Sequence, residues 1–210
     1  MKWKKAISIV CMALSLLAVT ACGRQQAAQN GGSKAAGTAA AEKAPAKAKK
    51  VLVVYYTNTH RTEQVAKTIA GETGGDLYLL DLEKPYTPAD LDYNNKSARV
   101  YKEHDDSSLR NVALKNAKPA NWQDYDTVFV GYPIWWGIAA WPMDTFVKSN
   151  DFTGKTVIPF ATVYSSGLGS SADQLKEMAG SKGTWLQGRC FTGTIQDSQV
   201  KDWVKSLGVK

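Results

Sequence analysis

Three closely spaced threonines, Thr57, Thr59 and Thr62, are the first residues in this sequence that could do chemistry. They follow an unbroken apolar and aromatic run at residues 51–56 and precede apolar positions with helical spacing. The first backbone N–H groups of a helix lack partners within the helix, and the helix dipole favours an anion there. Hydroxyl groups at such a strand-to-helix turn can therefore help to bind a phosphate. The same threonines could instead only cap the helix, and this stretch alone leaves both interpretations open.

A second unusual loop consists of Pro133, Ile134, Trp135, Trp136 and Gly137. Two successive tryptophans offer large flat surfaces in a rigid frame, and glycine permits a close approach of the backbone. Such a loop can receive a planar heterocycle, with backbone N–H and C=O groups at the edge of its ring. The alternative is that the tryptophans are core residues. One of them can be, but two successive large aromatic residues after a strand rarely both point inward.

The rest of the domain shows strand and helix patterns that alternate. Strands are predicted at residues 51–56, 76–82, 127–132 and 156–163, with a further short strand at 188–191. Residues 83–124 are a long polar stretch, predicted either as a functional segment or as a solvated loop with a short helix near 97–103. Predicted helices contain Val65, Ala66 and Ile69; Trp141, Phe146 and Val147; residues 171–179; and, after a cap at Asp197, Val200, Trp203, Val204 and Leu207.

This alternation predicts an α/β fold, namely a three-layer, doubly wound, five-stranded parallel sheet. In the strand order 2-1-3-4-5, the ligand crevice lies where the first and third strands part. Those two strands end at the threonine turn and at the tryptophan loop. We therefore expect the two loops to lie side by side, where a phosphate in one and a flat ring in the other describe an aromatic mononucleotide.

The threonine turn resembles the phosphate loop of flavodoxins, T/S-x-T-G-x-T, and reads TNTHRT here, with His60 in place of the glycine. Residues 51–210 as a whole resemble the flavodoxin-like superfamily, and most closely a branch that shares GxPIWWG followed by TF. This sequence has GYPIWWG at 131–137, TF at 145–146, PFAT at 159–162 and SGLG at 166–169. The turn lacks both the GK[ST] ending of a P-loop and the three glycines of a dinucleotide fingerprint, so neither of those sites is predicted.

The resemblance implies FMN as the cofactor. It implies that the FMN phosphate binds Thr57, Asn58, Thr59, His60, Arg61 and Thr62, and that the ring lies along Pro133, Ile134, Trp135, Trp136 and Gly137. Further contacts with the ring or the ribityl chain would come from Ser165, Ser166, Gly167 and Gly169. By the same analogy, the Trp136–Gly137 peptide would interact with the flavin N5. We also hypothesise that His60 and Arg61 place positive charge near the phosphate.

The first fifty residues are predicted to target and tether the domain. Residues 1–21 combine lysines, an apolar run and a small-residue cleavage site, which is typical of a signal peptide. The Val-Thr-Ala-Cys sequence that ends at Cys22 resembles a bacterial lipobox, in which the cysteine is lipidated. Residues 22–50 are dominated by Ala, Gly, Lys and Gln and predict a flexible tether. The expected protein is an exported domain of residues 51–210, anchored by lipid to the outer face of a membrane.

Charge and cysteine content exclude several functional classes. Residues 1–50 hold nine Lys or Arg and one acidic residue, whereas residues 51–210 hold seventeen and eighteen, so the domain is nearly neutral. A nucleic-acid partner therefore has no basis in the domain. Cys11 leaves with the signal peptide and Cys22 carries lipid, which leaves Cys190 without a partner for an intramolecular disulfide. Two histidines and one thiol support neither a metal site nor a Cys–His nucleophile.

Three functions fit this sequence. The first is an FMN electron-transfer protein that exchanges electrons with a membrane or soluble redox partner. The second is an FMN-dependent reductase of quinones or similar acceptors, with residues 83–124 shaping the substrate pocket. The third is a flavin-binding module without turnover. Because the cofactor carries the redox chemistry, no catalytic acid or base is required, and none is assigned. Nicotinamide donors are scarce outside the cytoplasm, and the lipid anchor favours membrane quinols or a membrane reductase as the electron source. Against simple shuttling, the domain is nearly neutral, whereas classical flavodoxins are strongly acidic. We expect an FMN redox protein, with electron transfer as its first role and a reductase as the alternative.

Overall fold

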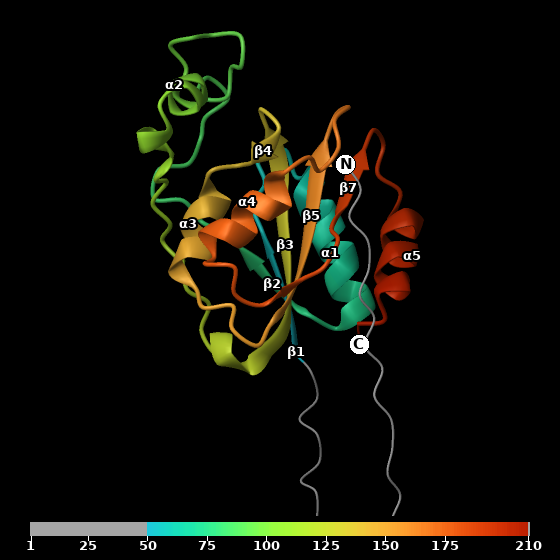
Figure 1. Cartoon of the computed structure of the whole chain (residues 1–210). Helices are drawn as coiled ribbons and strands as arrows, with labels where there is room; N and C mark the ends of the chain where they lie inside the picture. Colours follow the sequence, from blue (N-terminus) through green and yellow to red (C-terminus); the bar gives the residue numbers. More distant parts are fainter. Residues whose placement is uncertain (1–49, 210) are drawn as a thin grey trace, which may run out of the picture. The chain divides into compact units, whose positions relative to one another are not determined.

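The computed structural model describes residues 50–209 of the chain (Figure 1). The predicted signal peptide, the lipidation site Cys22 and the predicted tether up to residue 49 lie outside the described residues. Between residues 50 and 209, every helix is too short or too polar to cross a bilayer.

Seven strands form one sheet in the described part of the chain. They are β1 Lys50–Tyr55, β2 Asp76–Leu79, β3 Tyr125–Trp135, β4 Ile138–Ala139, β5 Thr156–Val163, β6 Thr184–Trp185 and β7 Arg189–Thr192. Five α-helices join them: α1 Arg61–Thr73, α2 Arg99–Asp105, α3 Pro142–Ser149, α4 Ser171–Met178 and α5 Asp197–Leu207. Two short 3-10 helices, η1 Ser107–Arg110 and η2 Trp122–Asp124, lie between α2 and β3.

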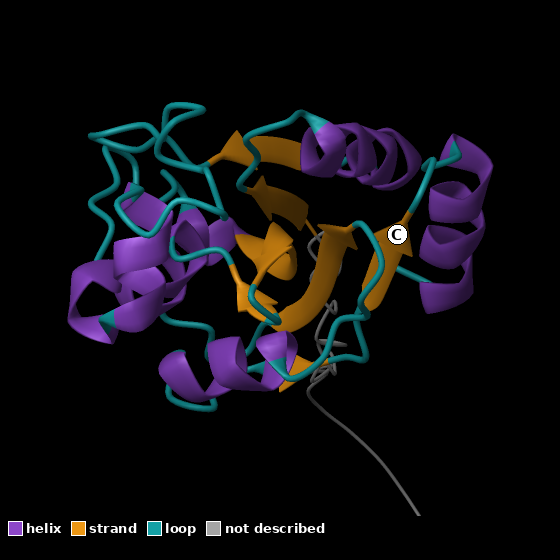
Figure 2. Ribbon diagram, turned by 90° about the horizontal axis from the view of Figure 1, so that it is seen from above, coloured by secondary structure: helices purple, strands orange, loops and turns teal. Residues whose placement is uncertain are grey.

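The strands are ordered β2-β1-β3-β5, and both β6 and β7 pair with the outer side of β5. All these pairings are parallel, and only the short β4 runs antiparallel, as a hairpin on the end of β3. With β6 and β7 counted as one interrupted fifth strand, this is the predicted order 2-1-3-4-5. Helices cover both faces of the sheet (Figure 2), so the three-layer α/β prediction is confirmed.

Alternate residues along the strands enter two separate hydrophobic cores, as the pleat of a strand requires. Val53 and Phe129 face one side, where α1 and α5 supply Ile69 and Trp203. On the other side, the side chains of β1 and β3 pack against α3 and α4, with Phe146 among the fully buried residues. Burial on both faces explains why the strand sequences are continuous apolar runs.

The first motif glycine, Gly131, has a packing role that involves the PFAT segment. Gly131 on β3 and Phe160 on β5 are register partners. A Cβ atom at residue 131 would lie 2.0 Å from Cζ of the Phe160 ring. Only glycine leaves room for this aromatic ring, so the two motifs are coupled by the core.

The fifth strand position is divided because β5 contains a proline. Pro159 offers no N–H group to a neighbouring strand. Between the two paired stretches, β5 advances from Val157 to Phe160 while its neighbour advances from Trp185 to Arg189, which is one residue more. At the extra residue, a Cβ on Gly188 would lie 2.4 Å from the Pro159 carbonyl oxygen. The prediction of a short strand near residues 188–191 is confirmed by β7, whereas β6 was not predicted.

Several predicted boundaries were wrong, and three of them have a physical cause. The second strand ends at Leu79 rather than at residue 82, because the chain turns there and Leu82 forms an antiparallel bridge with Leu114. The third strand continues past residue 132 to Trp135, because β4 pairs with its end. At α5 the N-cap is Gln196, and Asp197 is the first helical residue.

Candidate functional site

A cleft of about 400 Å³ opens where β1, β3 and β5 end. These are the carboxyl ends of parallel strands, and the cleft lies where the chain connections diverge, which is the usual ligand position in such sheets. Both predicted loops line it, together with the loop after β5 and part of the 83–124 segment. The lining residues are Thr57, Asn58, Thr59, Arg61, Leu91, Tyr93, Pro133, Ile134, Trp135, Thr162, Val163, Tyr164 and Ser165.

Two buried polar atoms in this lining have no hydrogen-bond partner within residues 50–209. They are Oγ1 of Thr57 and Oδ1 of Asn58. A buried polar atom without a partner costs about 1–3 kcal/mol, so native proteins rarely keep one without a reason. Nearby, burial raises the pKa of the Tyr56 phenol well above its ordinary value, against the lowering effects of Asn58 and Arg99. The Tyr56 phenol therefore stays neutral at physiological pH. The two unpaired oxygens, of Thr57 and Asn58, are suited to hydrogen bonds with a polar ligand.

The turn between β1 and α1 depends on a left-handed residue. His60 is the N-cap of α1, with φ 61° and ψ 1°, and its side chain makes no capping hydrogen bond. A glycine would adopt this conformation without strain, which gives a physical reason for the glycine in the motif that the turn resembles. Histidine is among the side chains that occupy this region more often than most. No side chain in the described part of the chain caps the N-terminal N–H groups of α1.

The charged and hydroxyl side chains of this turn point in different directions. The His60 ring is highly exposed and lies 2.6 Å from a carboxylate oxygen of Glu63, outside the cleft. Arg61 does line the cleft; its Nη2 donates to the Gly193 carbonyl at 2.6 Å. The Thr62 hydroxyl is buried beneath the turn, 2.9 Å from the hydroxyl of Thr162 on β5. Of the two residues hypothesised to bring positive charge, only Arg61 is thus on the cleft.

The two tryptophans of the β3–β4 hairpin have different environments. Trp135 is 3 % exposed and makes edge-to-face contacts with Tyr56, Tyr86 and Trp141. Trp136 is 36 % exposed and has a left-handed φ of 45°. One tryptophan is therefore a core residue that also forms a wall of the cleft, and the other lies at the surface.

The tip of the hairpin meets the loop that follows β5. Gly137 has φ 80°, and its carbonyl oxygen lies 3.3 Å from where a Cβ on Gly169 would be. Gly169 itself has φ 57°, so both residues need the conformational freedom of glycine. Tyr164, in the same loop, is 84 % exposed, and the Arg61 guanidinium lies 5.5 Å from the centre of its ring.

The 83–124 segment surrounds Trp136 with aromatic side chains. The ring of His104 on α2 stacks on Trp136, with centroids 4.4 Å apart and planes 27° apart. Tyr93 and Tyr101 lie 4.6 Å and 6.0 Å from the same indole. Arg110 holds the end of α2 in place by donating to backbone carbonyls of that helix and lying over Trp141. The segment is thus an ordered part of the cleft's rim.

Comparison with known proteins agrees with this geometry. The sequence profile of the family described as Flavodoxin matches residues 50–207. The chain belongs to the flavodoxin family. No curated protein sequence gives a significant match.

Solved structures show the same fold. A candidate flavoprotein from Bacteroides eggerthii is 39% identical, with a TM-score of 0.69 over 77% of this chain and 99% of that one. A candidate flavoprotein from Bacteroides uniformis is 38% identical, with a TM-score of 0.69 over 76% and 99%. A flavoprotein from Lactobacillus acidophilus, solved in complex with FMN, is 21% identical, with a TM-score of 0.54 over 74% and 99%.

Not all the predicted site residues line the cleft of this flavodoxin-family protein. Those that do are Thr57, Asn58, Thr59, Arg61, Pro133, Ile134, Trp135 and Ser165. Those absent from its lining are His60, Thr62, Trp136, Gly137, Ser166, Gly167 and Gly169. The lining residues that sequence reasoning missed are Leu91, Tyr93, Thr162, Val163 and Tyr164. The position of Tyr164, directly after the fourth predicted strand, was a usable signal; nothing local distinguishes Leu91.

No cluster of His, Cys, Asp or Glu in the described part of the chain could hold a metal ion. Cys190 is half-buried, and burial raises the pKa of its thiol. It therefore remains a protonated thiol at neutral pH.

The turn at His60 can be tested by two substitutions. We expect His60→Gly to be at least as stable as the natural protein and more stable than His60→Ala, by about 1 kcal/mol, because only glycine relieves the left-handed backbone. Both variants lose the exposed contact with Glu63, so their difference isolates the backbone term. Urea unfolding measures it, and equal stability of the two variants would show that the turn is not strained.

Proposed function

We propose that this protein is an FMN-binding redox protein that transfers electrons at the outer face of a bacterial membrane. The observation that carries the proposal is the cleft at the ends of β1, β3 and β5, with two unpaired buried polar atoms, in a chain of the flavodoxin family. The Lactobacillus acidophilus flavoprotein was solved in complex with FMN and shares the fold.

The cleft residues fit the parts of this cofactor. The Thr57 hydroxyl and the uncapped N–H groups at the start of α1 suit the phosphate, and Arg61 adds a positive charge. The side-chain amide oxygen of Asn58, Oδ1, can accept a hydrogen bond from a ribityl hydroxyl. The aromatic walls formed by Trp135 and Tyr164 suit a planar ring. Bound FMN would supply the redox chemistry.

The cleft lining carries little charge. It contains no carboxylate and no imidazole, and Arg61 is its one strongly basic residue. Because bound FMN would supply the redox chemistry, neither a carrier nor a reductase needs such groups from the protein. The residues present are suited to binding and orienting the cofactor, which supports FMN binding in either role.

The arrangement of the sheet suits a partner outside the membrane. β1 begins at Lys50, at the end of the sheet opposite the cleft (Figure 1). The proposed lipid anchor on Cys22 would join the domain at that end. The cleft would then be accessible to a redox partner protein in solution, or to the membrane if the domain turns on its tether.

A second candidate, an FMN-dependent reductase of quinones or similar acceptors, is favoured by one observation. The rings of Tyr93, Tyr101 and His104 gather around the surface-exposed Trp136. Such a group of rings could stack with a planar acceptor near the cleft.

Cofactor binding is tested by Thr57→Val, which keeps the shape of the side chain and removes its hydroxyl. A hydrogen bond to a charged group contributes about 1.5–3 kcal/mol, so we expect the affinity for FMN to fall by roughly tenfold to 150-fold. The FMN-free protein should lose no stability, because its Thr57 hydroxyl is unpaired. Fluorescence titration and thermal unfolding give the two values. Thr68→Val, on the outer part of α1, is the control, and equal FMN affinity in both variants would contradict the proposed phosphate site.

Location is tested by Cys22→Ser. We expect the natural chain in the membrane fraction of cells and the variant in the soluble extracytoplasmic fraction, because a serine cannot carry the lipid. Fractionation with detection of the domain measures this. If the natural chain and Cys22→Ser are distributed identically between the fractions, the proposed lipid anchor is wrong, whereas the proposal of FMN binding is not affected.

The two redox roles differ in how the reduced protein reacts with a quinone. After reduction of the FMN-loaded chain by dithionite, we expect its reoxidation rate to rise linearly with menadione concentration and to be unchanged in Tyr101→Leu. A carrier forms no specific complex with the quinone. If the rate instead saturates with menadione, and a higher menadione concentration is needed to saturate it in Tyr101→Leu, the protein binds the quinone and the reductase role is established.

A further inference from the structure

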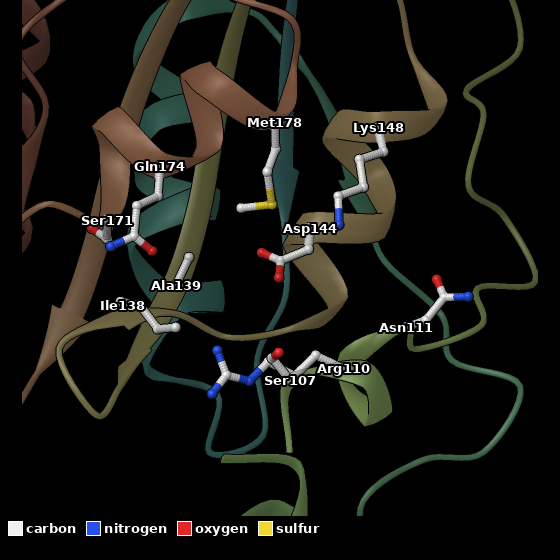
Figure 3. A pocket seen from close by; sticks show the side chains of 10 residues that line it. All are labelled: Ser107, Arg110, Asn111, Ile138, Ala139, Asp144, Lys148, Ser171, Gln174 and Met178. Atoms are coloured by element: carbon white, nitrogen blue, oxygen red, sulfur yellow. The ribbon is translucent and has the colours of Figure 1, made fainter. Parts of the chain in front are cut away.

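A second cavity, of about 370 Å³, lies on the other side of the β3–β4 hairpin. It is enclosed by η1, β4, α3 and α4 and shares no lining residue with the cofactor cleft. Figure 3 shows the Asp144 carboxylate, the Met178 thioether and the Gln174 amide directed toward one space, with the Arg110 guanidinium below them. Side chains from four separate elements thus converge on a space that the cofactor does not need.

The Asp144 carboxylate is near the two cations of this cavity but makes no hydrogen bond with either of them. Asp144 and Lys148 are four residues apart on α3, a spacing at which opposite charges commonly pair. Within residues 50–209, however, no hydrogen bond or close ion pair reaches the Asp144 carboxylate, although Lys148 and Arg110 are near enough to lower its pKa. Burial raises the pKa of Asp144 to about 6, against the lowering effect of Lys148 and Arg110. The carboxylate of Asp144 thus makes no hydrogen bond within the described residues, which is costly for a half-buried polar group.

The cations nearby are only partly used. Arg110 donates from Nε to the Glu103 carbonyl and from Nη2 to the His104 carbonyl, and its third nitrogen, Nη1, makes no hydrogen bond within the described residues. Lys148 makes no ion pair there either. The cavity therefore offers a negative group and two positive groups to one ligand.

The remaining wall is apolar. Ile138 and Ala139 of β4 form one side, and the unbranched thioether of Met178 covers another. Methionine adapts its shape to different apolar groups. A ligand with a short aliphatic part could pack here while its charged groups meet Asp144 and the two cations.

We propose that this cavity binds a small zwitterion, an α-amino acid with an aliphatic side chain. Its ammonium group pairs with Asp144, its carboxylate with Arg110 and Lys148, and its side chain packs on Ile138 and Met178. A simple anion would leave Asp144 unpaired, and a simple amine would leave both cations unpaired, so the complementary ligand carries both charges.

The test compares three probes of one shape by calorimetry on the full chain: L-leucine, 4-methylpentanoate, which lacks the amine, and isopentylamine, which lacks the carboxylate. We expect leucine to bind with a Kd below about 1 mM and each of the other probes to bind at least tenfold more weakly. Asp144→Asn should weaken leucine binding by about thirtyfold or more, because it leaves the ammonium without its partner. Lys148→Met should weaken leucine and 4-methylpentanoate alike.

Two matched controls keep the result specific. Asp173→Asn on the outer side of α4 and Lys118→Met on an exposed loop change the same charges outside the cavity and should leave leucine binding unchanged. Thermal unfolding of each variant shows whether it is folded. Equal binding of leucine and 4-methylpentanoate, or no binding of leucine at about 10 mM by the folded natural chain, would overturn the proposal.

Discussion

The parallel pairing of β1 with β3 is the constraint on which the rest of the structure depends. Because parallel strands cannot be joined by a tight turn, each must be followed by a crossover, and all their carboxyl ends meet at one edge. The chain leaves β1 toward β2 on one side and returns to β3 on the other. The two loops that leave this point therefore diverge and keep a cleft between them, which residues of the long insertion and of the β5 loop complete.

The fold could be predicted because its signals are local. Strands buried on both faces appear as continuous apolar runs, and amphipathic helices between them show their period. The misplaced boundaries have causes that are not local. The end of β3 is extended by pairing with β4, and the fifth strand is divided by Pro159 of its neighbour. The sequence at the end of β3 does not show that β4 will pair with it, and the sequence of the fifth strand does not show that Pro159 lies beside it.

The same distinction applies to the site. Thr57 and the tryptophan loop could be located because they follow predicted strands, and the order of strands brings them together. The hydroxyl of Thr62 looks equivalent to that of Thr57 in the sequence, but it is bonded to Thr162, a residue one hundred positions away. Tyr93 reaches the cleft from a segment without periodicity, and only the tertiary structure shows that this segment is ordered around Trp136.

The β3–β4 hairpin is a partition only two residue pairs long. Ile134 and Trp135 face the cofactor cleft, and their ladder partners, Ala139 and Ile138, face the second cavity. A shift of this ladder would therefore change the shape of both the cofactor cleft and the second cavity. If occupancy of the cavity changes the affinity for a ligand in the cleft, thermodynamic reciprocity requires that the ligand in the cleft change the affinity of the cavity by the same factor. The hairpin would then make the affinity of the cleft for its own ligand depend on the concentration of the small molecule that occupies the cavity.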